Sequence, residues 1–392
     1  MSLPRKNLIL PILILSQFAC TSLWFAGNAI VDELAFKTGI GLEITAFVLT
    51  SVQLGFIIGT LVFALLMIAD RFSPSKVFFI CAVLAAFCNF SLMVHVLSKE
   101  HLLFARFGTG FFLAGIYPVG MKIAADYYEN GLGKALGLLV GALVFGTAFP
   151  FLIGGLELGE NYQMVLTITS ALSILGGGLI YFFVPNGPFR KPSIKLQLKA
   201  GIALFKITDF RTAAFGYFGH MWELYAFWAF TPLALKTINS IHNVDFSIPL
   251  WTFATIALGG ISCSIGGYFS EKYGSYKVAL FALLISGGFC LVSPMLFQLP
   301  TYLFITAWCI WGMAVTADSP QFSSLVAQAA PSQLKGTGLT LVNCLGFAIS
   351  IASIQLVSFM AKETESTFIF IFLACGPLFG VYHLIRGKQY FS

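Results

Sequence analysis

The sequence predicts an all-α membrane protein with twelve transmembrane helices in two six-helix, pseudo-symmetric halves. Composition, the recurrence of apolar runs and an internal repeat lead to this prediction. Of the 392 residues, 58% are hydrophobic and only 10% are charged, whereas a soluble domain carries about 25% charged residues. So few charges cannot cover a water-facing surface, and runs long enough to cross a bilayer recur from end to end. The chain is therefore expected to be a multi-pass protein surrounded by the lipid bilayer.

Windows of about 20 apolar residues define the expected spans. They lie near residues 8–31, 44–68, 76–98, 102–125, 134–156, 163–184, 212–235, 248–269, 277–297, 301–325, 336–360 and 367–386. The stretch between the sixth and seventh spans is rich in Lys and Arg and is expected to be a solvated linker. The predicted domains are thus a six-helix bundle over residues 1–184, a cytoplasmic basic linker over 185–211 and a second bundle over 212–392.

The distribution of Lys and Arg predicts the orientation in the membrane. With both termini in the cytoplasm, the inner loops and tails hold 16 of these residues and the outer loops hold four. Cytoplasmic loops of membrane proteins carry such an excess, so we expect an N-in, C-in topology. The net charge of +6 could suggest an acidic partner, but most Lys and Arg lie in alternate loops, which reflects orientation in the membrane, so no nucleic-acid partner is expected. The eight cysteines are scattered and are expected to be small buried hydrophobic residues rather than metal ligands.

The two halves repeat each other at an offset of 201 or 202 residues. The matched positions are Asp70 with Glu271, Gly110 with Gly312, Pro118 with Pro320, and Lys134 with Lys335. Each match occupies the same place in its half, after span 2 or 8, in span 4 or 10, and at the start of span 5 or 11. Because each half has an even number of spans, the repeats run parallel, which places a substrate site near the midplane between the halves.

Two of the repeated segments resemble motifs of the major facilitator superfamily of transporters. The likeness of the chain to this family covers essentially its whole length. Residues 66–76 are similar to the family's Gly-x-Leu-Ala-Asp-Arg-x-Gly-Arg-Lys loop, and residues 267–277 are a second copy. The glycine-rich run that follows Arg106 is similar to its helix 4 motif. The resemblance implies the twelve-helix fold of bacterial-type members, in the inner membrane of a cell. The gating residues that it implies are Asp70, Arg71, Lys76, Glu271 and Lys272.

In such a gate, Asp70 could accept from backbone N–H groups at a neighbouring helix N-terminus. Arg71 and Lys76 could pair with acids on adjacent helices, so that the contacts hold one state closed and break in the other. The alternative is a charged loop that only sets the topology.

Glu223 lies about twelve residues into span 7, near the middle of the bilayer by the ~1.5 Å rise per residue. An ionisable residue there is a functional candidate, because charge in hydrocarbon is costly. Apolar surroundings favour the uncharged carboxyl, so Glu223 could load and release a proton. His220 lies one turn earlier on the same face. The alternatives are a structural glutamate tied to a neighbouring helix and a structural histidine.

Asp318 is the second acidic candidate for substrate or proton binding, in the tenth span. Pro320 follows it and can kink the helix by removing a backbone hydrogen bond. Gln321 adds a further polar group beside the break. The alternative for Asp318 is a buried ion pair that locks helices together.

Two basic residues lie within the fourth span. The family resemblance makes Arg106 a candidate in proton coupling, where its charge would tune a nearby acid, and structural helix pairing is the alternative. Lys122 could neutralise an anionic substrate. It also lies four residues before Asp126, so a local pair on one helix face is the alternative.

Aromatic and amide side chains complete the expected cavity. The resemblance implies that helices 1, 4, 7 and 10 line it, where aromatic rings could stack on a planar or hydrophobic substrate. The expected cavity residues are Trp24, Asn28, Gln53, Tyr117, Tyr225, Trp228, Gln321 and Asn343. Core or lipid-facing positions are the alternative for each aromatic residue.

The function expected from these observations is secondary active transport by alternating access. The chain has no HExxH sequence and no nucleophile–base set, so we do not expect an enzyme, and without a Walker A sequence ATP is not the driver. We expect a single chain to move a small organic solute, with a carboxylate favoured, coupled to protons. No cofactor beyond a proton or ion gradient is expected. The alternative is a proton-driven exporter of drugs and other hydrophobic compounds.

Overall fold

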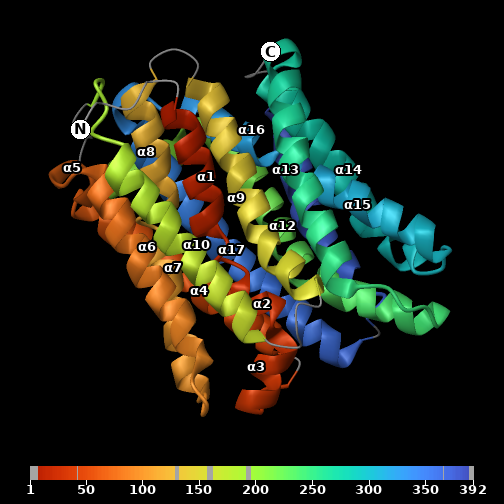
Figure 1. Cartoon of the computed structure of the whole chain (residues 1–392). Helices are drawn as coiled ribbons and strands as arrows, with labels where there is room; N and C mark the ends of the chain where they lie inside the picture. The colour runs from red at the N-terminus through yellow and green to blue at the C-terminus, as the bar shows by residue number, and fades with distance from the viewer. Residues whose placement is uncertain are drawn as a thin grey trace. The chain divides into compact units, whose positions relative to one another are not determined.

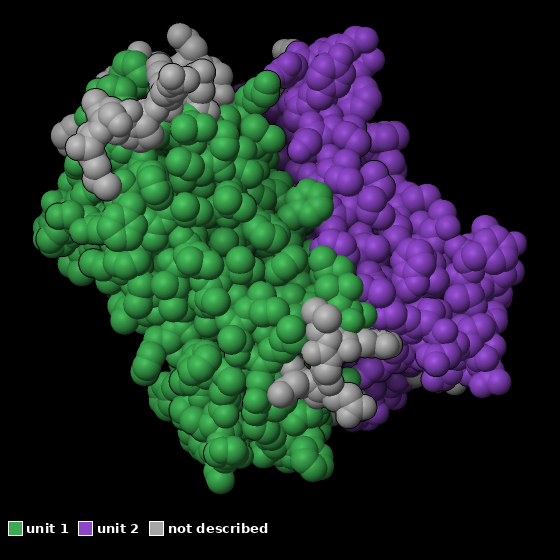
Figure 2. All heavy atoms as spheres, viewed as in Figure 1, with its two compact units in different colours: residues 1–195 green, residues 196–392 purple. Residues whose placement is uncertain are grey.

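The computed structural model describes residues 8–41, 43–128, 132–156, 162–190, 196–364 and 366–387. These residues form α-helices and short 3-10 helices, and none of them lies in a strand. The chain divides into two compact units, Met1–Lys195 and Leu196–Ser392 (Figure 2). The division falls within the segment predicted as the linker, whose bounds stay a prediction.

The first unit is a bundle of long helices joined by short turns (Figure 1). Its α-helices are α1 (Ile9–Thr21), α2 (Ala26–Ala29), α3 (Val31–Thr38), α4 (Ile44–Leu65), α5 (Ile68–Arg71), α6 (Pro74–Phe90), α7 (Lys99–Leu113), α8 (Tyr117–Tyr127), α9 (Leu132–Gly155) and α10 (Tyr162–Phe183). Helix α4 packs along α7, α6 packs along α10, and α1 contacts both α9 and α10. Helix α8 follows α7 after a turn at residues 114–116, and Lys122 on α8 contacts Asp70 in α5.

The second unit is built around its longest helix, α12. Its α-helices are α11 (Leu198–Ala203), α12 (Thr208–His242), α13 (Ile248–Tyr273), α14 (Ser275–Leu296), α15 (Thr301–Ala317), α16 (Ser319–Ala329), α17 (Lys335–Glu363) and α18 (Cys375–Arg386), the last preceded by the 3-10 helix η5 (Ile369–Ala374). Helix α12 packs against α17 and α18, and α13 packs along α15. The buried face of α12 is rich in aromatic residues and holds His220 and Glu223.

Within the described residues, nine helices are long and apolar enough to cross a membrane. They are Ile44–Leu65, Pro74–Met93, Lys99–Tyr127, Leu132–Gly155, Tyr162–Phe183, Ile248–Tyr273, Ser275–Leu296, Ser332–Glu363 and Ile369–Arg386. Each overlaps a predicted span, and the all-α membrane class is confirmed. The count of twelve and the orientation stay predictions.

The three remaining predicted spans are not among these nine helices, and the structure shows the reason for each. The span at 8–31 is interrupted, because α1 ends at Thr21 and α2 begins at Ala26. The span at 301–325 is interrupted at Asp318, between α15 and α16. The span at 212–235 lies within α12, a continuous helix that carries many polar and aromatic residues. These are the first, seventh and tenth spans, three of the four helices that the resemblance implied line the cavity.

The repeated glycines of the two halves have the same packing role. A side chain at Gly110 of α7 would collide with the backbone of Val52 on α4. In the second unit, a Cβ at Gly312 of α15 would lie 2.6 Å from the carbonyl oxygen of Thr255 on α13. In both units the helix backbones therefore approach closely at the matched position, as small residues permit in membrane proteins.

Candidate functional site

Glu223 is fully buried in the second unit and is held by three neutral donors. The indole nitrogen of Trp311 on α15 lies 2.6 Å from Oε1. From α14, the hydroxyl of Ser286 lies 2.8 Å from Oε2, and the thiol of Cys290 lies 3.3 Å from Oε1. Because all three donors belong to α14 and α15, the carboxyl joins α12 to two neighbouring helices of its own unit.

Aromatic rings surround the Trp311 side of this carboxyl. The ring of Trp311 lies 4.7 Å from that of Phe227 and 4.9 Å from that of Trp308, and it stacks on Phe289 at 6.0 Å. Trp308 in turn donates to the hydroxyl of Thr231, 3.2 Å away. These rings exclude water and lower the local dielectric, which strengthens every polar contact that Glu223 makes.

His220 and Asp318 form an ion pair in the interior of the same unit. The Nδ1 atom of His220 lies 2.8 Å from Oδ1 of Asp318, and both side chains are fully buried. Among the described residues, the other polar atoms of the pair, Nε2 of His220 and Oδ2 of Asp318, have no hydrogen-bond partner. The pair connects α12 to the junction of α15 and α16.

The helix break beside Asp318 is stabilised from α13. Pro320 has no N–H, so the carbonyl of Thr316, four residues earlier, loses its helical partner. The thiol of Cys263 donates to that carbonyl at 3.3 Å, and the hydroxyl of Ser262 donates to the carbonyl of Met313 at 2.7 Å. Side chains of α13 thus donate to two carbonyls in the last turn of α15, next to the break.

Arg106 is fully buried and spans the interruption between α1 and α2. Its Nη2 atom lies 2.6 Å from the carbonyl oxygen of Trp24 and 3.2 Å from that of Leu23. Its Nη1 atom also lies 3.3 Å from Oδ1 of Asn89. Among the described residues no carboxylate pairs with Arg106, so its guanidinium serves the backbone of the broken helix. Its expected effect on an acid stays a prediction.

Lys122 forms an ion pair with Asp70 of the loop motif. The Nζ atom lies 2.8 Å from Oδ1, and the two side chains are 18% and 15% exposed. The guanidinium of Arg190 donates to the carbonyl of Asp70 at 2.8 Å and to that of Phe72 at 2.9 Å. Lys122 therefore contacts the loop of the expected gate. Its spacing to Asp126 in the sequence suggested only a local pair on the same helix.

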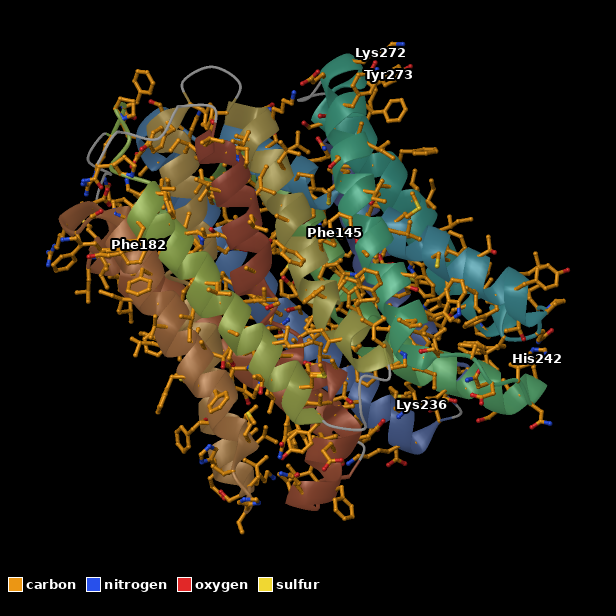
Figure 3. All side chains as sticks on the ribbon, in the orientation of Figure 1. Phe145, Phe182, Lys236, His242, Lys272 and Tyr273 are labelled. Carbon is orange, nitrogen blue, oxygen red and sulfur yellow. The ribbon has the colours of Figure 1, made fainter. Side chains whose placement is uncertain are left out.

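The remaining residues of the two loop motifs are arranged differently. Within the part of the chain that the structure describes, the ion pairs do not include Arg71 or Lys76, and their pairing with acids on adjacent helices stays a prediction. In the second copy, Lys272 lies over the ring of Tyr273, 5.1 Å from its centre, at the end of α13 (Figure 3). Glu271 is exposed. Only the first copy holds a described ion pair to another helix.

The expected cavity residues are mostly buried. In the first unit, Trp24 packs edge-on against Phe56 with 4.9 Å between ring centres, and the amide of Asn28 donates to the carbonyl of Thr45 at 3.3 Å. Gln53 is fully buried on α4, and Tyr117 begins α8.

In the second unit, the rings of Tyr225 and Trp228 lie 5.5 Å apart on α12. Asn343 accepts a 2.8 Å hydrogen bond from the hydroxyl of Tyr217, and Gln321 is buried on α16. The role of these residues in lining a cavity stays a prediction.

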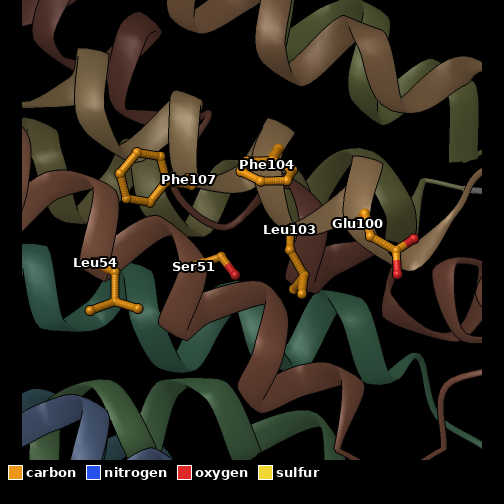
Figure 4. A pocket seen from close by; sticks show the side chains of 6 residues that line it. All are labelled: Ser51, Leu54, Glu100, Leu103, Phe104 and Phe107. Carbon is orange, nitrogen blue, oxygen red and sulfur yellow. The ribbon is translucent and has the colours of Figure 1, made fainter.

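A groove of about 240 Å³ lies on the first unit, between α4 and α7 (Figure 4). It is lined by Ser51, Leu54, Glu100, Leu103, Phe104 and Phe107. None of the predicted site residues lines it. Its lining is largely apolar and Phe104 is 76% exposed, so we assign the groove to the lipid-facing surface of the bundle.

The donors to Glu223 were not among the predicted site residues. Ser286 and Cys290 lie 63 and 67 residues from Glu223 in the chain, within an ordinary apolar span. Trp311 resembles Trp308, the other tryptophan of its span. Asn89, which contacts Arg106, is an isolated amide in the third span. Each of these residues can be noticed as a hydrogen-bonding side chain within an apolar span. Such side chains are common in this sequence, so the pattern alone could not identify the partners of Glu223 and Arg106.

Comparison with known proteins identifies the family. The model of the major facilitator superfamily matches residues 12–354. The chain belongs to the major facilitator superfamily. It is thus a multi-pass inner-membrane transporter, as the loop motifs and the repeat predicted.

A curated relative of this superfamily member is the multi-drug resistance efflux pump PmrA homologue of Lactococcus lactis. The two are 29% identical over 240 residues, which is 59% of this chain. The matched part spans 58% of the relative's length.

Two solved structures share the superfamily fold at low sequence identity. A bacterial homologue of the human lysosomal transporter Spinster, inward-facing and unoccupied, is 15% identical with a TM-score of 0.70, covering 100% of this chain and 98% of that one. The human organic anion transporter MFSD10 is 14% identical with a TM-score of 0.74, covering 97% of this chain and 100% of that one. These likenesses show the fold alone.

Proposed function

We propose that this protein is a proton-coupled secondary transporter in which Glu223 carries the coupled proton, and that it exports hydrophobic compounds. The observation that carries the proposal is the environment of Glu223. The carboxyl is fully buried, and its described partners are an indole, a hydroxyl and a thiol, all of them neutral. A buried carboxylate without a cation is costly, so binding a proton relieves a substantial penalty.

The second buried acid suits a different role. Asp318 has His220 as an ion-pair partner at 2.8 Å, so its negative charge can be compensated without a proton from outside. We therefore assign the variable charge to Glu223 and a fixed ion pair to Asp318 and His220, which holds α12 against the break between α15 and α16.

The substrate class follows from the residues that are already engaged. The preference for a carboxylate substrate depended on Arg106 and Lys122, and Arg106 binds backbone carbonyls whereas Lys122 pairs with Asp70. Neither cation is thus free to balance an anion in this state. The aromatic residues and the two acids instead suit a lipophilic, cationic compound. The efflux pump from Lactococcus lactis, similar over part of the chain, supports this alternative.

The test uses the purified protein in proteoliposomes with an imposed pH gradient and ethidium as the probe. The wild type is expected to move ethidium in exchange for protons. Glu223→Gln keeps an acceptor for Trp311 but cannot carry a proton, so it should lose gradient-driven movement and keep ethidium exchange at equilibrium. Gradient-driven movement by this variant would overturn the role of Glu223.

The same vesicles test the substrate class separately. A radiolabelled aromatic carboxylate is offered in place of ethidium, at the same pH gradient. Gradient-driven movement of the carboxylate with no movement of ethidium would overturn the export of hydrophobic cations and favour an organic anion carrier, while leaving the role of Glu223 intact.

A further inference from the structure

The three hydrogen bonds to Glu223 distinguish its two oxygens. Oε1 faces the indole N–H of Trp311 at 2.6 Å and the thiol of Cys290 at 3.3 Å. An indole N–H only donates, and a thiol sulfur is a weak acceptor. A proton on Oε1 would therefore point at groups that cannot accept it well. Among the described side chains, Oε2 has one partner, the hydroxyl of Ser286, at 2.8 Å.

Ser286 can serve both charge states of this carboxyl. Its oxygen lies 2.8 Å from Oε2 and 3.3 Å from the carbonyl oxygen of Leu283 in the preceding turn of α14. A serine hydroxyl both donates and accepts, and its hydrogen rotates to suit its partners. It can thus donate to a charged Oε2, or turn to the Leu283 carbonyl and accept from a protonated one.

Building on the proposed proton coupling at Glu223, we infer that the coupled proton resides on Oε2 and that Ser286 reverses its hydrogen bond each time this proton arrives or leaves. On loading, a hydronium ion of the aqueous phase supplies the proton, an O–H bond forms at Oε2, and the carboxylate becomes neutral. The Ser286 hydrogen turns from Oε2 to the Leu283 carbonyl. On release, the O–H bond at Oε2 breaks, water takes the proton, and the hydroxyl turns back.

The other titratable groups near Glu223 have separate roles. Cys290 of α14 already faces Oε1, and Asp318 pairs with His220. Cys375 begins α18, which packs along α12, and is exposed. None of these groups is placed to accept a hydrogen bond from Oε2. Ser286 is therefore a positioning residue for the proton, and Trp311 determines which oxygen receives it.

The assignment predicts opposite roles for the two oxygens in infrared spectra. When the proton is on Oε2, the carbonyl of the protonated acid is C–Oε1, which accepts from Trp311. Trp311→Phe should then shift the carbonyl stretching band of Glu223 to higher frequency, because that carbonyl loses its strong donor. If the proton were on Oε1, the band would stay almost unchanged, since Trp311 would face the hydroxyl oxygen.

The experiment is acid-minus-alkaline infrared difference spectroscopy of the full chain in lipid bilayers, in H₂O and in D₂O. Glu223→Gln identifies the band by removing it. Ser286→Ala should shift the band and slow its deuterium exchange several-fold, whereas Ser286→Thr should restore wild-type exchange. The matched control is Ser293→Ala, also fully buried on α14, whose hydroxyl donates to the carbonyl of Cys290 at 2.7 Å.

The outcomes separate this inference from the proposed function. If Glu223→Gln removes no titrating band, Glu223 carries no proton and both proposals fail. If the band is present but Ser286→Ala leaves its frequency and exchange rate as in the wild type, the reversal at Ser286 is overturned and Glu223 keeps its role. If Ser286→Ala does not fold, Trp311→Phe still decides the oxygen, because an unshifted band contradicts a proton on Oε2.

Discussion

The indole nitrogen of Trp311 donates a 2.6 Å hydrogen bond to Oε1 of Glu223 inside the second unit. The bond connects α15 to α12, and the pair between His220 of α12 and Asp318, at the junction of α15 and α16, holds the same helices together. Hydrogen bonds to charged groups are roughly twice as strong as neutral ones. The strength of this helix contact therefore depends on whether Glu223 carries its proton.

We expect Trp311→Phe to lower stability more at high pH than at low pH. The variant leaves an oxygen of a buried carboxyl without its best donor, which costs about 1–3 kcal/mol when the group is charged. As pH falls and Glu223 binds its proton, the lost bond becomes a neutral one and the cost shrinks. Thermal unfolding in detergent at several pH values measures this trend.

Trp308→Phe is the matched control for that series. Trp308 is also fully buried on α15, but its indole donates to the neutral hydroxyl of Thr231 at 3.2 Å. Its destabilisation should stay constant over the same pH range. Equal pH dependence of the two variants would contradict a charge-dependent bond at Trp311.

Arg106→Lys is expected to destabilise the protein nearly as much as Arg106→Ala. The guanidinium reaches the carbonyls of Leu23 and Trp24 and the side chain of Asn89 together, and an ammonium cannot copy this fork. Each buried carbonyl left unpaired costs about 1–3 kcal/mol. Thermal unfolding measures the loss, with the exposed Arg211→Ala as a control that should change stability little. A wild-type melting temperature for Arg106→Lys would contradict this role.

Lys122 should be energetically coupled to Asp70 rather than to its neighbour Asp126. A double-mutant cycle of Lys122→Ala with Asp70→Ala should give a coupling energy of about 1 kcal/mol, since the pair is partly exposed. The cycle of Lys122→Ala with Asp126→Ala is the control and should give a smaller value. Transport rates of the exchanged pair, Asp70→Lys with Lys122→Asp, then show whether the contact acts in gating. A larger coupling energy in the Asp126 cycle would contradict this prediction and favour the local pair of Lys122 with Asp126.

The repeated glycines should tolerate no side chain. Gly110→Ala and Gly312→Ala each place a methyl group against the backbone of the neighbouring helix, and overpacking costs about 1–3 kcal/mol. Gly137→Ala in α9 and Gly288→Ala in α14 are matched controls, because a Cβ at either position meets no atom within 4 Å. The controls should be neutral or slightly stabilising by thermal unfolding. Equal effects at all four positions would contradict close helix approach at the repeat.

Much of the fold could be predicted because hydropathy and charge act locally along the chain. Apolar runs of membrane length mark the helices wherever lipid demands them, and the offset between Asp70 and Glu271 reveals two related halves without any coordinates. The loop motif indicated the family, and the cost of charge in hydrocarbon selected Glu223 and Asp318 as the residues to examine.

The interruptions within the spans were only partly predictable. Pro320 predicts the break at Asp318, because proline has no N–H to donate to the carbonyl four residues earlier. The break between α1 and α2 has no such marker, since residues 22–25 include no proline or glycine. Two carbonyls at this break accept from Arg106, which comes from a distant helix. Hydropathy depends on side chains alone, so it cannot predict which partner a backbone carbonyl has.

The sequence by itself determined the membrane class, the repeat and the presence of two acids in apolar helices. Only the tertiary structure decided their partners, giving Glu223 an indole, a hydroxyl and a thiol and giving Asp318 an imidazole. Helix-forming tendency depends on neighbours a few residues away, whereas the partners of Glu223 lie 63 to 88 residues from it. Which groups meet is determined by how helices rotate and pack, and that depends on all their contacts at once.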